Sequence, residues 1–218
     1  MKRGLFLDLD GTLAATLPML REAYLSFLAD FEATGCEAEF QALNGPPLTV
    51  IVQRLQAAHA LPGPPETLLR RYQERLAAVH GQAEPAPGAR GVLERAGTQG
   101  WTVAVVSSNT GASTRAWLAR TGLDGLVATV VGGDEVLHGK PEPEPYLRAL
   151  ALTGCEAARS LAIEDSPQGA VAAIAAGLNT WLVGPAPAEA LTPAAAARER
   201  HPLFCGRLPD FQAVASLL

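Results

Sequence analysis

The chain has 218 residues, of which 48% are hydrophobic, and a formal net charge of −5 at pH 7. A chain of this length and composition can bury a substantial core, which argues against disorder and favours one domain, or one domain with a smaller insertion. The acidic balance, without any long basic run, argues against binding to nucleic acid or to a membrane surface.

No hydrophobic run reaches the length of a transmembrane helix, and no apolar signal core precedes the first acidic residues. The three cysteines, Cys36, Cys155 and Cys205, show neither a CxxC pair nor the spacing of a zinc site. Incidental thiols in a reducing compartment explain them better than a disulfide framework does. These features together predict a cytoplasmic protein.

Short hydrophobic runs alternate with helical patterns along most of the chain. The runs are apolar on both faces and rich in β-branched residues, which is typical of strands in a buried parallel sheet. Strands are predicted at Leu5–Leu9, Thr102–Val106, Val127–Val131, Leu161–Ile163 and Thr180–Val183. Helices are predicted at about Gly91–Gly97, Ser113–Arg120, Pro145–Leu152 and Pro167–Ala176. This alternation predicts an α/β fold with a doubly wound parallel sheet.

Residues 14–86 interrupt the alternation. Hydrophobic residues recur there at helical spacing, no convincing strand is present, and Pro46–Pro47 and Pro64–Pro65 stand where helices can begin. We therefore expect a small all-α domain over residues 14–86, inserted into an α/β core domain of residues 1–13 and 87–218. Glu84–Gly88 is predicted to be the return linker.

Two aspartates, Asp8 and Asp10, close the first predicted strand in the segment DLDGTL. Ligands bind outside the carboxyl ends of strands in open α/β sheets. Neighbouring carboxylates are costly unless a cation neutralises them, and their hard oxygens suit Mg²⁺. Gly11 lets the chain turn away sharply. From this pattern alone, a metal site and a capped strand end with surface acids are about equally supported.

Two further groups could hold a phosphate. Ser107, Ser108 and Asn109 follow the strand Thr102–Val106, where a hydroxyl and free backbone N–H groups can bind phosphate oxygens, although serine and asparagine also cap ordinary helices. Lys140 lies in the segment GKPEPEP, whose glycine and prolines restrict the backbone. A cation placed so rigidly can neutralise a phosphate.

Glu164 and Asp165 follow the strand Leu161–Ile163 and could complete a Mg²⁺ site. Ser166 and Pro167 come next and are typical of a helix N-cap and first turn. A capped helix beside two surface acids is the alternative interpretation of this segment.

In their order along the chain, FLDLDGTL, the SSN segment, GKPEPEP and EDSPQG resemble the four signature motifs of the haloacid dehalogenase (HAD) superfamily. The resemblance covers essentially the whole chain, and it implies a Rossmann-like HAD core with a C1 helical cap. It implies a Mg²⁺-dependent phosphatase in which Asp8 is the nucleophile that forms an aspartyl-phosphate and Asp10 is the general acid and base. The resemblance makes Asp8, Asp10 and Lys140 catalytic. It assigns phosphate binding to Ser107, Ser108, Asn109, Lys140, Gly11 and Thr12, and metal binding to Asp8, Asp10, Glu164 and Asp165.

The resemblance also implies that the cap closes over the site, with hinges near Leu13–Leu17 and Gly81–Gly88, and contacts the substrate. The first candidate for these contacts is the loop Asn44-Gly45-Pro46-Pro47, and Arg54, His59, Arg70 and Arg71 are further candidates.

Subfamily features point in two directions, toward phosphoglycolate phosphatases and toward β-phosphoglucomutase and related sugar-phosphate phosphatases. Leu20 stands where the mutase has a histidine, and Ala15 stands where many members have an aspartate. A phosphatase acting on a small phosphorylated metabolite, of the phosphoglycolate or sugar phosphate type, is therefore the preferred interpretation. A mutase-like phosphotransferase is the alternative, and a haloacid dehalogenase or a non-catalytic binding module is less well supported. A monomer or a homodimer fits the sequence equally well.

Overall fold

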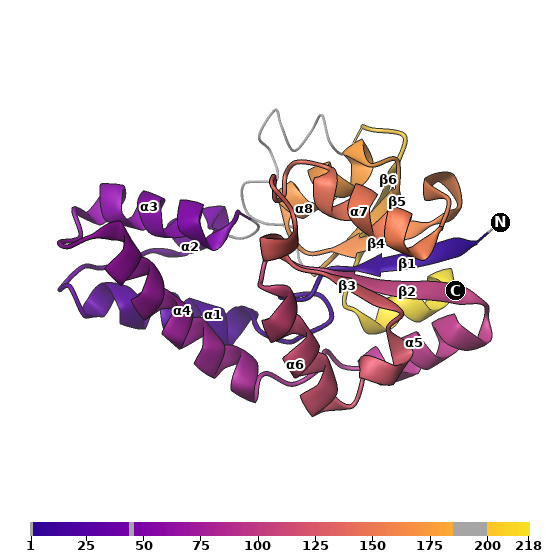
Figure 1. Cartoon of the computed structure of the whole chain (residues 1–218), viewed down its shortest axis with the longest axis horizontal. Coiled ribbons are helices and arrows are strands. Elements are labelled where there is room, and N and C mark those ends of the chain that lie inside the picture. The colour runs from indigo at the N-terminus through magenta and orange to yellow at the C-terminus, as the bar shows by residue number, and fades with distance from the viewer. Residues whose placement is uncertain (1, 44–45, 185–199) are drawn as a thin grey trace.

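The computed structural model describes residues 2–43, 46–184 and 200–218, and Figure 1 shows an α/β core with a group of helices at one end. In this described part the core contains one six-stranded sheet, in the order β3-β2-β1-β4-β5-β6, and every neighbouring pair is parallel. The strands are β1 Arg3–Leu7, β2 Trp101–Val106, β3 Thr129–Val131, β4 Leu161–Glu164, β5 Asn179–Val183 and β6 Phe204–Leu208. The predicted doubly wound parallel sheet is confirmed.

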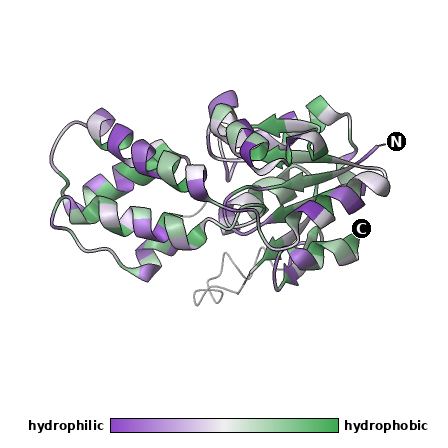
Figure 2. Cartoon of the chain, turned by 90° about the horizontal axis from the view of Figure 1, so that it is seen from below, coloured by the Kyte–Doolittle hydropathy of each residue, from purple (hydrophilic) through white to green (hydrophobic). Residues whose placement is uncertain are grey.

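Successive residues of the central strands face opposite sides of the sheet, as a pleated strand requires. Leu5 and Leu7 of β1 pack into one hydrophobic cluster, to which α5 (Ala89–Thr98) and α6 (Gly111–Thr121) contribute. Phe6 packs into a second cluster on the other face, with side chains of α7 (Glu144–Thr153) and α8 (Pro167–Ala175). Burial on both faces explains why these strands are continuous hydrophobic runs, and Figure 2 shows the sheet as the most uniformly hydrophobic part of the ribbon.

Capping residues fix where the core helices begin. The hydroxyl of Thr110 accepts a hydrogen bond from the backbone N–H of Ser113 at the start of α6, and Ser166 does the same for Gly169 at the start of α8. Each cap satisfies an N–H group that would otherwise lack a partner in the first turn. Short 3₁₀ helices lie at Asp124–Leu126, Gly133–Glu135, Ala157–Arg159 and Gln212–Leu217.

Four helices between β1 and α5 form the group at the end of the molecule in Figure 1: α1 Leu17–Ala29, α2 Glu37–Ala42, α3 Leu48–His59 and α4 Pro65–Gln82. They share a separate hydrophobic cluster that includes Phe27, Leu55 and Tyr72. The two connections to the core run side by side, because the N–H of Ala15 donates to the carbonyl of Glu84 and the N–H of Ala86 donates to that of Leu13. The helical insertion therefore has its own core and a paired connection. Its domain boundaries at residues 14 and 86 stay a prediction.

All five predicted strands are present with ends shifted by a few residues, whereas β6 was not predicted. It pairs with β5 alone, at the edge of the sheet, and its sequence FCGRL contains a glycine at φ 132° and an arginine. An edge strand needs no apolar residues on both faces, so it lacks the hydrophobic run that identifies the central strands. No helix in the described ranges has the length and hydrophobicity needed to cross a bilayer.

Candidate active site

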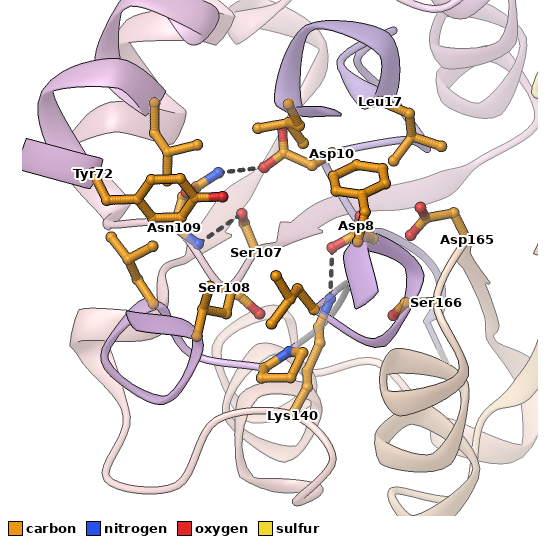
Figure 3. Close-up of a pocket in the computed structure, with 17 residues that line it drawn as sticks. Asp8, Asp10, Leu17, Tyr72, Ser107, Ser108, Asn109, Lys140, Asp165 and Ser166 are labelled. Atoms are coloured by element: carbon orange, nitrogen blue, oxygen red, sulfur yellow. Dashed lines mark hydrogen bonds and ion pairs between the residues drawn. The ribbon is translucent and has the colours of Figure 1, made fainter. Parts of the chain in front are cut away.

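Three neighbouring strands end at one cavity. Asp8 follows β1, Ser107 follows β2, and Asp165 follows β4. The strand order reverses between β1 and β4, and open α/β sheets bind ligands at such a switch point. Figure 3 shows these side chains facing a common space together with Lys140, which comes from the segment before α7. The core residues that line the cavity are Asp8, Asp10, Ser107, Ser108, Asn109, Lys140, Asp165 and Ser166.

Lys140 links the two buried acids of the site. Its Nζ donates to the Asp8 Oδ1 at 2.6 Å, to the Glu164 carboxylate, and to the Val106 carbonyl at 2.9 Å, although only 2% of the side chain is exposed. Burial alone would lower the pKa of this ammonium group, but the charges of Asp8 and Glu164 outweigh burial and raise the pKa above its ordinary value. Lys140 therefore stays charged.

Asp8 is buried beside one cation and two other acids. Burial raises the pKa of Asp8 well above its ordinary value, and the charges of Glu164 and Asp165 raise it further, while Lys140 lowers it in part. The carboxylate form of Asp8 therefore gains from any additional positive charge placed in the cavity.

The carboxylates of Asp8, Glu164 and Asp165 each offer an oxygen within 4.8 Å of the others. Such a set of hard oxygen donors fits Mg²⁺. Asp8 and Asp165 line the cavity, whereas Glu164 lies behind them, fully buried. The fit is therefore best for Asp8 and Asp165 as direct ligands, with Glu164 in a supporting position. Asp10 is expected to bind the metal through its backbone carbonyl, and its side chain lies outside this cluster of carboxylates.

The Asp10 carboxylate faces the other side of the cavity, where two side chains hold it. Asn109 donates from its amide to Oδ2, as Figure 3 shows, and His80 Nε2 lies 2.9 Å from Oδ1. Burial would lower the pKa of His80, but the hydrogen bond and charge of Asp10 and the Leu76 carbonyl together raise it. A protonated His80 donates to the carboxylate, so the Asp10 side chain is held in place at the cavity.

Sequence reasoning did not find His80. It lies in the last turn of α4, beside the predicted hinge Gly81–Gly88, in a helix that otherwise carries no motif. Arg120 of α6 donates to the backbone carbonyl of His80, and the Trp117 indole donates to that of Ala83. These contacts anchor the end of α4 to the core, and they depend on tertiary packing that no local pattern reports.

We expect replacement of His80 by alanine to lower kcat by roughly 10- to 100-fold with little change in KM, because a misplaced acid or base weakens catalysis more than binding. Glutamine at the same position should restore part of the loss, since its amide can donate to Asp10. His59→Ala is the matched control, because His59 pairs with Glu39 away from the cavity. An equal loss of kcat in His80→Ala and His59→Ala would show that His80 has only a structural role.

Glu164 is fully buried among hydrogen-bond partners. Besides Lys140, the Tyr146 hydroxyl donates to it at 2.5 Å, and the Ser166 hydroxyl lies 3.3 Å from Oε2. Gly169 lies directly against it, because a Cβ at this position would come within 2.1 Å of the carboxyl group. The sequence therefore keeps a glycine where the helix passes the acid.

Gly169→Ala is expected to destabilise the protein by about 1–3 kcal/mol, as overpacking of a core does, and to lower activity by displacing Glu164 from Lys140. Gly91→Ala in α5 provides the control, because a Cβ there meets no atom within 4 Å and alanine favours a helix by about 0.5–1 kcal/mol. Thermal unfolding of both variants measures the difference. A Gly169→Ala protein as stable and active as the Gly91→Ala protein would contradict this account.

Other predicted site residues lie outside the cavity. Gly11 provides the turn after Asp10 at φ 78°, and a Cβ there would meet Asp165 at 2.2 Å. Thr12 is buried, its hydroxyl has no hydrogen-bond partner in the described part of the chain, and neither residue lines the cavity.

Two of the predicted cap contacts, Asn44 and Gly45, lie outside the described residues. Arg54 lies on an exposed face of α3, and its Nη1 is 3.4 Å from the carbonyl of Ala42. Pro46 of the predicted contact loop lines the cavity, whereas Arg54, His59, Arg70 and Arg71 do not.

Leu20, in contrast, does line the cavity, at the position where the mutase resemblance expects a histidine. Ala15 is exposed within the paired connection between the two parts. An aspartate is therefore not needed there for this connection to form.

Comparisons with known proteins agree with this geometry. A family model for haloacid dehalogenase-like hydrolases matches residues 5–183. The chain is 32% identical to a phosphoglycolate phosphatase of Rhodospirillum rubrum over 187 residues, covering 82% of this chain and 78% of the relative. It is 31% identical to the fructose-1-phosphate phosphatase YqaB of Escherichia coli over 180 residues, covering 81% and 93%. The crystal structure of CbbY from Rhodobacter sphaeroides with phosphate has the same fold, with a TM-score of 0.77, 24% identity and coverage of 97% and 96%.

Proposed function

This chain belongs to the haloacid dehalogenase-like hydrolase family, and we propose that it is a Mg²⁺-dependent phosphatase that hydrolyses a small phosphate monoester through an aspartyl-phosphate on Asp8. The observation that carries the proposal is the pairing of Asp8 with Lys140 at the cavity, 2.6 Å apart, beside a second aspartate held by Asn109 and His80. Asp8 is placed to attack phosphorus, and Asp10 is placed to transfer protons. Residues 14–86 are proposed as the cap over this site.

In the first half of the reaction, an Asp8 oxygen attacks phosphorus, the bond from phosphorus to the ester oxygen breaks, and Asp10 gives its proton to the leaving alcohol. Lys140, held against Asp8, provides positive charge beside the transferring group, and Ser107 and the backbone N–H groups after β2 orient the phosphate oxygens.

In the second half, Asp10 takes a proton from water as the water attacks the phosphorus of the aspartyl-phosphate. Inorganic phosphate leaves and Asp8 is free again. The hydrogen bonds from Asn109 and His80 keep the Asp10 carboxylate at the same place for both proton transfers. Asp10 ends each cycle in the protonated form with which it began.

Asp8 and Asp165 are proposed to hold the Mg²⁺, with Glu164 behind them. When bound, the ion supplies the positive charge that neutralises the phosphate and favours the ionised form of Asp8. The mutase-like alternative gains no support from the cavity, since Leu20 offers no polar group at the position of the mutase histidine.

Release of inorganic phosphate from a set of esters tests the proposal. The relatives named above make 2-phosphoglycolate and fructose 1-phosphate the first candidates from the comparisons. We expect release that stops when EDTA removes the metal and returns with Mg²⁺. Full activity in EDTA would reject the metal-dependent mechanism. Transfer of the phosphoryl group to an added sugar without release of phosphate would favour the phosphotransferase.

A further inference from the structure

The cap side of the cavity is built from hydrocarbon. Six half-buried side chains, called here the apolar wall, line it from the four cap helices: Leu17 and Leu20 of α1, Phe40 of α2, Leu48 and Ile51 of α3, and Leu76 of α4. A contiguous patch of partly uncovered apolar side chains is typical of a ligand-binding groove or an interface. Because the wall faces Asp8 and Asp10 across the cavity, it is placed to contact the alcohol part of a bound ester.

Among the residues that the structure describes, no charged side chain lines the cap side of the cavity. Lys140 is the only cation among the described lining residues, and it lies on the core side, engaged by Asp8 and Glu164. The cap arginines discussed above do not line the cavity. A second anionic group on the substrate, such as a carboxylate, would thus lie against hydrocarbon without a cation to pair with, which is strongly disfavoured.

A single polar side-chain group is present on the cap side, among the residues that the structure describes there. It is the hydroxyl of Tyr72, whose side chain reaches the cavity in Figure 3. Burial raises the pKa of Tyr72 to about 12, so the hydroxyl stays protonated at neutral pH. It can donate one hydrogen bond, far fewer than the hydroxyl groups of a sugar would need.

Resting on the phosphatase function proposed above, we propose that the substrate is the phosphate ester of a mainly apolar alcohol, aromatic or aliphatic, with at most one polar group near Tyr72. Such an alcohol would cover the apolar wall, and it would bring no polar group that lacks a hydrogen-bond partner there. A carboxylate or a hydroxyl-rich sugar would lose hydrogen bonds to water there without gaining hydrogen bonds to the protein. The preferred ester therefore differs in chemistry from phosphoglycolate and from sugar phosphates.

The test compares benzyl phosphate and n-butyl phosphate with 2-phosphoglycolate and fructose 1-phosphate, at one Mg²⁺ concentration. We expect kcat/KM to be at least tenfold higher for the better apolar ester than for either polar ester, with the difference mainly in KM. A smaller ratio, or a preference for a polar ester, would overturn the proposal about the alcohol.

Acetyl phosphate separates this failure from failure of the proposed function, because its small acyl group makes few contacts with the wall. Hydrolysis of acetyl phosphate that depends on Asp8, without a preference for apolar esters, would leave the phosphatase function intact and reject the apolar-alcohol proposal. No release from acetyl phosphate or from any of the four esters would reject both.

A charge placed in the apolar wall gives a second test. Leu20→Arg should lower the ratio of kcat/KM for n-butyl phosphate to that for 2-phosphoglycolate by at least tenfold, because a butyl group cannot replace the hydration of the guanidinium, whereas a carboxylate can pair with it. Ala57→Arg adds the same charge on an exposed face of α3 that does not line the cavity, so its ratio should equal that of the native protein. An unchanged ratio in a folded Leu20→Arg protein would contradict the proposal. If the Leu20→Arg protein does not fold, the ratio of kcat/KM between apolar and polar esters in the native protein still tests the proposal.

Discussion

Asp8→Asn is expected to abolish phosphate release, lowering kcat by roughly 10⁴-fold or more, because the amide cannot attack phosphorus and no other carboxylate occupies its position. The fold should be kept. In the metal-free protein, burial and the acids Glu164 and Asp165 raise the pKa of Asp8, so its ionised form is less stable folded than exposed to water. A neutral asparagine removes this unfavourable charge, and Lys140 keeps Glu164 as its partner.

Two measurements separate loss of the nucleophile from loss of structure. Thermal unfolding of Asp8→Asn without metal should show a midpoint no lower than that of the native protein. The stabilisation that Mg²⁺ gives the native protein should become smaller, since one ligand is gone. Asp124→Asn is the matched control, an exposed aspartate before β3 at the opposite end of the sheet. Activity in Asp8→Asn above a few per cent would remove Asp8 from the role of nucleophile.

Lys140→Met is expected to affect both activity and stability. The loss of the cation beside the transferring phosphate should lower kcat by about 100- to 1,000-fold. It also leaves Asp8 and Glu164 buried without their common partner, and breaking a buried pair in this way costs about 3–5 kcal/mol of unfolding free energy. Lys2, exposed and the only other lysine of the chain, provides the control Lys2→Met.

The pH dependence of stability identifies the cause of this loss. Without the cation, the folded-state pKa of Asp8 should lie further above its unfolded value, so the folded protein binds more protons than the unfolded chain. Stability of Lys140→Met should therefore fall as pH rises, and the deficit against the native protein should be smaller at pH 5 than at pH 8. The double variant Lys140→Met with Glu164→Gln should regain stability but not activity. A deficit independent of pH would point to lost packing instead.

The local sequence predicts the core side of the site well because its residues follow recognisable strands. Asp8 and Asp165 come directly after runs that must be buried on both faces, and the carboxyl ends of parallel strands meet at one edge of the sheet. Lys140 required the motif resemblance, since nothing in GKPEPEP shows which acids it will reach across more than a hundred residues.

The remaining features depend on how elements pack against one another. His80 reaches Asp10 only because Arg120 and Trp117 anchor the end of α4 to the core. The apolar wall follows the same helical spacing as the buried core of the cap, so its members could not be told apart from core residues by periodicity. Only the placement of the cap helices beyond the carboxyl ends of the strands separates the two sets.

The central position of β1 has a consequence for how the protein is made. Its five residues pair with β2, where Arg3 lies opposite Trp101, and Leu5–Leu7 also pair with β4, where Leu5 lies opposite Leu161. On a ribosome, the strand that leads to Asp8 emerges before both of its neighbours, and the helices from Leu17 to Gln82 can pack together while it waits for β2 and β4. Such distant pairings are slow to form. The nascent chain thus carries this hydrophobic strand with at least one unpaired edge until β4 has been translated, and catalytic competence arrives only after that point.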